Sequence, residues 1–113
     1  MSRLSTHVLD LTTGNPAIGI SLLLEIRRET AWIRLAAAAT DDDGRVRDLL
    51  AAPQALERAT YRLTFETGVY FAKSDTPCFH PQVVVTFDIT DPARPHHVPL
   101  LLSPFGYSTY RGT

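Results

Sequence analysis

Apolar residues recur at every second position in three separate stretches of this chain. These stretches are residues 18–26, 61–65 and 83–89. A period of two places alternate side chains on opposite faces of a strand, so each stretch predicts a half-buried β-strand. Strand-breaking residues separate them at positions 14–16, 41–44, 75–77 and 91–95. The pattern indicates an all-β sandwich of about seven or eight short strands.

Two further stretches have the composition of helices. Residues 49–58 contain good helix formers, but Pro53 interrupts them, so we predict a short edge strand and a loop there. Residues 68–73 precede the next breaker and are predicted to form one or two helical turns.

Length and charge limit the classes of protein to which the chain can belong. With 113 residues it is expected to form one domain, spanning residues 1–113, and its single cysteine, Cys78, excludes an intrachain disulfide. The net charge of −1 and the absence of any long run of like charge argue against nucleic-acid binding. No segment has the ~18 apolar residues of a membrane span, and the N-terminus lacks the apolar core of a secretion signal. We therefore expect a cytoplasmic protein that does not bind membranes.

Several motifs resemble those of one known family. They include Ser-Thr-His-Val-Leu-Asp at residues 5–10, Gly-Asn-Pro-Ala at 14–17, Thr-Asp-Asp-Asp-Gly-Arg at 40–45, and the stretches 61–65 and 67–71. The tail carries His-Val-Pro-Leu-Leu-Leu-Ser-Pro at 97–104 and ends in Tyr-Arg-Gly-Thr at 110–113. Together they resemble the 5-hydroxyisourate hydrolases, the enzymatic branch of the transthyretin family. Thr113 replaces the serine of the family signature and keeps its hydroxyl group.

The resemblance implies a fold, an assembly and a reaction. The fold is a transthyretin-like (prealbumin-like) sandwich of two four-stranded antiparallel sheets with one short helix. The assembly is a homotetramer, a dimer of dimers, with active sites in a central channel. The reaction is hydrolysis of 5-hydroxyisourate to 2-oxo-4-hydroxy-4-carboxy-5-ureidoimidazoline during urate degradation, without a cofactor.

The same resemblance selects the candidate site residues. A lone histidine in a strand is usually structural, but His7 and His97 fall at the catalytic positions of the family. Arg45 directly follows the turn glycine, as the active-site arginine of the family does. Thr113 is implied as a fourth catalytic residue, and Tyr110 and Arg111 as substrate-binding residues of the channel wall. His80, His96 and Arg47 match no such position, so we predict structural histidines and a surface arginine.

These side chains suit hydrolysis of an oxidised purine. A planar guanidinium, neutral imidazoles and a hydroxyl match a planar substrate with several carbonyl and amide edges. An imidazole has an unperturbed pKa of about 6.5 and can accept a proton from water, which typically accelerates a reaction ~10²–10⁴-fold. Our hypothesis assigns the base to His7, the substrate anion to Arg45 and substrate orientation to His97, although either histidine can be the base.

Other functions remain open at this point. The main alternative is a non-enzymatic small-ligand carrier of the transthyretin type, in which a lysine, a glutamate and a threonine replace His7, Arg45 and His97. A structural β-sandwich module is a third possibility. Symmetry-related histidines could also bind zinc incidentally, but the proposed chemistry needs no metal.

Overall fold

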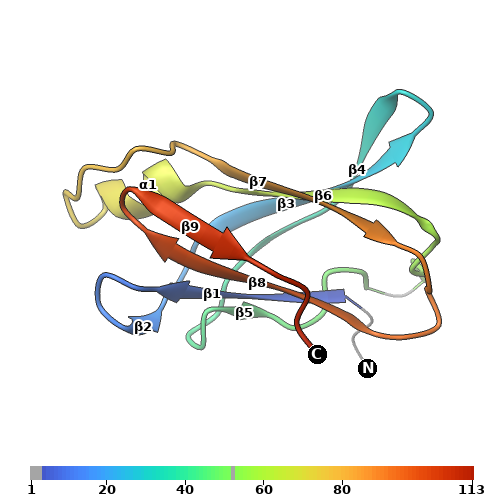
Figure 1. The fold of residues 1–113 in the computed structure, drawn as a ribbon, viewed down its shortest axis with the longest axis horizontal. Helices are drawn as coiled ribbons and strands as arrows, with labels where there is room; N and C mark the ends of the chain where they lie inside the picture. Colours follow the sequence, from blue (N-terminus) through green and yellow to red (C-terminus); the bar gives the residue numbers. More distant parts are fainter. Residues whose placement is uncertain (1–3, 52) are drawn as a thin grey trace.

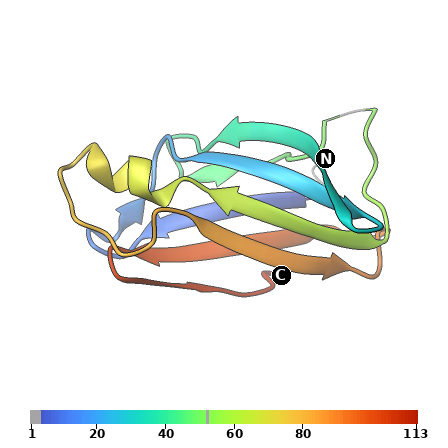
Figure 2. The same cartoon turned by 90° about the horizontal axis from the view of Figure 1, so that it is seen from above.

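Two packed β-sheets and one short helix make up the computed structural model, which describes residues 4–51 and 53–113 (Figure 1). The elements are β1 (Leu4–Asp10), β2 (Asn15–Pro16), β3 (Ser21–Arg28), β4 (Ala31–Ala39), β5 (Arg45–Val46), β6 (Ala59–Phe65), α1 (Thr67–Ala72), β7 (Val83–Ile89), β8 (His96–Ser103) and β9 (Gly106–Thr109). The two-sheet sandwich with one short helix is confirmed. Both views place α1 at one end of the sandwich (Figures 1 and 2).

The sheets differ from the expected arrangement in two details. One sheet has the order β4-β3-β6-β7 and is antiparallel throughout. The other has five strands instead of four, because β5 pairs with β1 beside the path β2-β1-β8-β9. Within it β1 and β8 are parallel, not antiparallel. This pair joins a strand from the start of the chain to one from its end in the middle of the second sheet. No local sequence pattern encodes whether such distant strands pair parallel or antiparallel.

The core follows from the period-two pattern. Leu22, Leu24 and Ile26 of β3 are buried in one hydrophobic core, together with side chains of β6 and β7 from the same sheet and of β1 and β8 from the other sheet. Each such side chain contributes about 1.5–3 kcal/mol on leaving water. Strand β3 begins at Ser21, later than the apolar pattern suggested, because Ile18 is exposed in a turn where Gly19 has a positive φ of 72°.

The two stretches of helical composition have different outcomes. Helix α1 forms where it was predicted, over Thr67–Ala72. The short strand predicted within residues 49–58 is wrong, because the described residues of that segment form only loop. Leu49, Leu50 and Leu56 of this loop are nevertheless buried in the core, which explains its apolar composition without a strand. Among the described residues, no helix is long and apolar enough to cross a membrane.

Candidate active site

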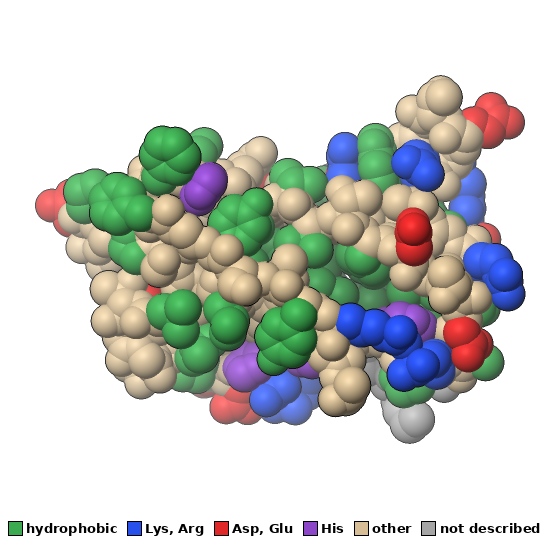
Figure 3. All heavy atoms as spheres, viewed as in Figure 1, with side chains coloured by type: hydrophobic (Ala, Val, Ile, Leu, Met, Phe, Trp, Pro, Cys, Tyr) green, Lys and Arg blue, Asp and Glu red, His purple; other side chains and the backbone are tan. Residues whose placement is uncertain are grey.

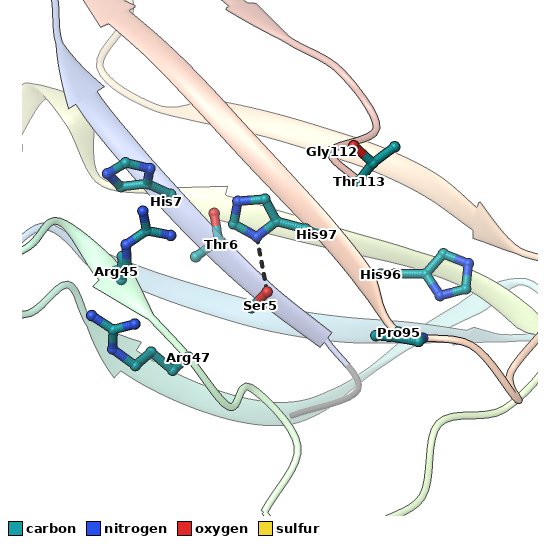
Figure 4. Close-up of a pocket in the computed structure, with 10 residues that line it drawn as sticks. All are labelled: Ser5, Thr6, His7, Arg45, Arg47, Pro95, His96, His97, Gly112 and Thr113. Carbon is teal, nitrogen blue, oxygen red and sulfur yellow. Dashed lines mark hydrogen bonds between the residues drawn. The ribbon is translucent and has the colours of Figure 1, made fainter. Parts of the chain in front are cut away.

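Three neighbouring strands of the five-stranded sheet carry the predicted catalytic side chains. In the antiparallel β1–β5 pair, His7 lies opposite Arg45. In the parallel β1–β8 pair, Ser5 lies opposite His97. Ser5 and His7 are half-buried on one face of β1, while the alternate residues Leu4, Thr6 and Val8 are fully buried in the sandwich. Register and alternation together therefore place both imidazoles and the guanidinium on the same outer face (Figure 4).

These side chains surround a hollow of about 600 Å³. Its lining consists of Ser5, Thr6, His7, Arg45, Arg47, Pro95, His96, His97, Gly112 and Thr113 (Figure 4). The hollow thus brings together the four residues predicted as catalytic, although they come from both ends and the middle of the chain. Its size is within the range of pockets that hold small molecules.

A tight turn determines where Arg45 lies. The side chain of Asp41 accepts hydrogen bonds from the backbone N–H groups of Asp43 and Arg45, both at 2.9 Å. Gly44 follows with φ of +73° and its carbonyl accepts a 2.8 Å hydrogen bond from the N–H of Val8. The turn is thereby attached to β1, which holds Arg45 beside His7.

The environment keeps both histidines neutral near neutral pH. Burial is the main cause that lowers the pKa of His7, and the charge of Arg45 lowers it further, while a hydrogen bond with the Asp43 backbone opposes the change. The pKa of His97 is lowered by burial, then by Arg45 and by His7. A neutral imidazole can accept a proton from water, so either ring can act as a general base.

His97 has defined partners. Its Nδ1 lies 2.8 Å from the hydroxyl of Ser5, and its carbonyl oxygen accepts a 2.8 Å hydrogen bond from the N–H of Gly112. Sequence reasoning did not select Ser5 or Gly112 as site residues. The position of Ser5, two residues before His7 on the same face of a strand, is the signal that could have identified it.

The remaining histidines differ in position. His80 packs edge-on against the rings of Phe79 and Tyr107 and does not line the hollow. His96 is buried, lines the hollow, and has its Nδ1 3.0 Å from the carbonyl oxygen of Arg94. Burial is the main cause that lowers the pKa of His96.

Three charged or aromatic residues lie at or beyond the edge of the hollow. Arg47 is exposed, as expected for a surface arginine, yet it also lines the hollow, where it forms a 2.8 Å ion pair with Asp43. Tyr110 and Arg111 are exposed and line a second, smaller hollow of about 220 Å³ beside β7, not the first one. The second hollow is also lined by His97, so Tyr110 and Arg111 share it with one of the predicted catalytic residues. Nowhere in residues 4–51 and 53–113 do three or more His, Cys, Asp or Glu side chains cluster as metal ligands would.

Comparisons with known proteins agree with this geometry. The sequence profile of the HIUase/transthyretin family matches residues 4–112. The chain is 44% identical to the 5-hydroxyisourate hydrolase of Mus musculus over 115 residues, which cover 99% of this chain and 96% of that protein. The structure of Klebsiella pneumoniae 5-hydroxyisourate hydrolase superposes with a TM-score of 0.86 at 39% identity and full coverage of both chains. Sea bream transthyretin in complex with thyroxine superposes with a TM-score of 0.91 at 29% identity, covering 98% of this chain and 95% of that one.

Proposed function

This chain belongs to the HIUase/transthyretin family, and we propose that it is an enzyme that hydrolyses 5-hydroxyisourate. The observation that carries the proposal is the hollow in which His7, Arg45 and His97 meet. The lowered pKa of His7 and of His97 favours their neutral imidazoles, and Arg45 supplies a planar cation beside them, so the three groups suit general-base hydrolysis of an anionic, planar substrate.

In the proposed mechanism, water attacks the lactam carbonyl of the six-membered ring. His7 accepts the proton from water, and Arg45 binds the anionic substrate and stabilises the oxyanion that develops. His97 orients the substrate by hydrogen bonding, and the hydroxyl of Thr113 helps to hold the water. The carbon–nitrogen bond of the lactam then breaks and the proton passes to the departing nitrogen, which yields 2-oxo-4-hydroxy-4-carboxy-5-ureidoimidazoline.

A ligand carrier of the transthyretin type is the less supported candidate. Sea bream transthyretin shares the fold, so the sandwich alone does not distinguish a carrier from a hydrolase. The hollow does distinguish them, because an imidazole pair beside a guanidinium provides proton transfer, which a carrier does not need. The proposal therefore depends on these three side chains and not on the fold.

We propose further that residues 1–113 form one domain that assembles as a homotetramer, a dimer of dimers, in the cytoplasm. Strands β7 and β9 end their sheets, and exposed aromatic residues accompany β9: Phe105 is 71%, Tyr107 42% and Tyr110 58% exposed. Hydrophobic side chains gather over this part of the surface in Figure 3. Such an edge favours pairing with a second subunit. Tyr110 and Arg111 would then contribute to the wall of a shared channel.

The direct test is an assay on freshly made 5-hydroxyisourate, generated in place from urate by urate oxidase. The near-ultraviolet absorbance of the compound should decay faster when micromolar protein is added at neutral pH. Activity should be unchanged in the presence of a chelator, because the proposed mechanism uses no metal. A decay equal to the spontaneous rate would refute the enzymatic proposal.

A further inference from the structure

We propose that Ser5 and Gly112 are positioning residues that together hold the His97 imidazole in the one orientation in which it meets the substrate. This inference rests on the proposed hydrolase function. It concerns two residues that supply neither the general base nor the cation of the proposed reaction. They act through His97, which they contact from β1 and from the C-terminal segment.

Ser5 holds one nitrogen of the ring. Its hydroxyl lies 2.8 Å from Nδ1 of His97, and the two residues are register partners in the parallel β1–β8 pair. The bond joins the side chains of two residues 92 positions apart in the sequence, and both residues lie on paired strands and not on a loop. Because Nδ1 is engaged by Ser5, Nε2 is the nitrogen that remains for the substrate.

Gly112 holds the opposite side of the ring. Its N–H donates a 2.8 Å hydrogen bond to the carbonyl oxygen of His97, which brings the two backbones together in an isolated β-bridge. A Cβ atom at position 112 would lie 2.6 Å from Cδ2 of His97 and 3.2 Å from its Cβ and Cγ. Only glycine therefore leaves room for the ring where it now lies.

The two constraints are coupled through the torsions of a single side chain. The second torsion of a histidine is broad and roughly two-fold, so an unrestrained ring can flip, which exchanges the positions of Nδ1 and Cδ2 and those of Nε2 and Cε1. A Cβ at position 112 would force the ring to turn, and turning would carry Nδ1 away from the Ser5 hydroxyl. Loss of that hydroxyl would in turn remove the hydrogen bond that selects one of the two flipped ring orientations.

The test compares Ser5→Ala, Ser5→Thr and Gly112→Ala with two matched controls. Ser21→Ala removes an exposed serine hydroxyl from β3 in the other sheet, and Gly106→Ala adds a Cβ that meets nothing closer than 3.9 Å. Each variant is made both in the wild-type chain and in the His97→Ala chain. The readouts are kcat and KM on 5-hydroxyisourate, the melting temperature, and the ¹⁵N imidazole NMR spectrum of His97.

Ser5→Ala and Gly112→Ala should lower kcat by up to ~10²-fold, the cost of a misplacement of about 1 Å, with a smaller change in KM. Ser5→Thr should restore activity because it keeps the hydroxyl group. In the His97→Ala chain neither substitution should cost anything more, because residues that act as a unit are not additive. The His97 ¹⁵N shifts should change in both variants and stay constant in both controls.

Two outcomes would overturn the proposal. One is an unchanged His97 spectrum in Ser5→Ala and Gly112→Ala. The other is an equal loss of activity with and without His97, which for Gly112→Ala would place the effect on Thr113 instead. If the wild-type protein proved inactive, the hydrolase proposal would fail, while the His97 spectra would still decide whether Ser5 and Gly112 orient the ring.

Discussion

Arg45 is expected to act in two ways: on the pKa values of the two histidines and on the substrate. Its charge lowers the pKa of both His7 and His97, and its side chain lines the same hollow as the two imidazoles. The same guanidinium can therefore bind an anion and keep the bases unprotonated. His7, Arg45 and His97 are each only half-buried, so these side chains contribute few packing contacts to the core.

Replacing His7, Arg45 or His97 by alanine should consequently reduce activity more than stability. Loss of general-base help costs ~10²–10⁴-fold in rate, whereas side chains at a wet hollow contribute little to the core. We expect kcat/KM to fall in this range while the melting temperature stays close to that of the wild type. His80→Ala is the control, and the assignment is wrong if it is as inactive as His97→Ala at equal stability.

The lowered histidine pKa values also predict a pH profile. A protonated imidazole cannot accept a proton, so kcat/KM should fall on acidification, with an apparent pKa below the ordinary 6.5, and level off above it. In Arg45→Gln, NMR titration should show a higher pKa for both rings, since a positive charge has been removed. An acid limb well above pH 6.5 in the wild type would contradict this environment.

At the level of local elements, the turn at residues 41–44 decides where Arg45 lies. Gly44 and Gly14 both have positive φ, 73° and 76°, so alanine is strained at either position. They differ in surroundings, because a Cβ at Gly44 would lie 2.5 Å from the carbonyl oxygen of Val8, whereas none lies within 4 Å at Gly14. The two glycines therefore form a matched pair.

Gly44→Ala and Gly14→Ala should each lower the free energy of unfolding by the ~1–3 kcal/mol that a strained backbone costs, and with it the melting temperature. Only Gly44→Ala should also lower kcat/KM, because relief of its clash must shift β5 and with it Arg45. Thermal unfolding and the 5-hydroxyisourate assay measure the two effects separately. Equal activity in the two variants would show that the turn does not position Arg45.

At the scale of the whole molecule, the two faces of β8 differ in burial. Leu102 is 1% exposed and belongs to the core, while Leu101 is half-buried and points to the same outer face as His97. If the outer face lines a channel between subunits, Leu101 lies at a contact between chains and Leu102 does not.

A charge should therefore act differently at these neighbouring positions. Leu102→Asp should unfold the chain, because an unpaired charge cannot be accommodated in the core. Leu101→Asp should leave the subunit folded but shift the tetramer toward smaller species in sedimentation velocity experiments. A wild-type protein that sediments as a monomer at micromolar concentration would contradict the tetramer and its shared channel.

Local sequence patterns were sufficient for much of the fold, while the resemblance to a family supplied the candidate site residues. Period-two burial predicted the strands of the core, and the breaker at residues 75–77 helped to delimit α1. His7, Arg45, His97 and Thr113 were selected from motifs in the chain, and the structure brings all four to one hollow. The predictions of strands and of the helix succeeded because alternation and turn chemistry involve residues within a few positions of one another.

Other features emerged only when the chain was folded. The parallel pairing of β1 with β8, the contact of Ser5 with His97 and the fit of Gly112 against that ring all join distant segments. The loop at residues 49–58 was misread because its leucines are buried without a strand partner. Which strands pair, and in which direction, depends on the free energy of packing two whole sheets together. That free energy includes contributions from residues throughout the chain, so no single stretch of sequence determines it.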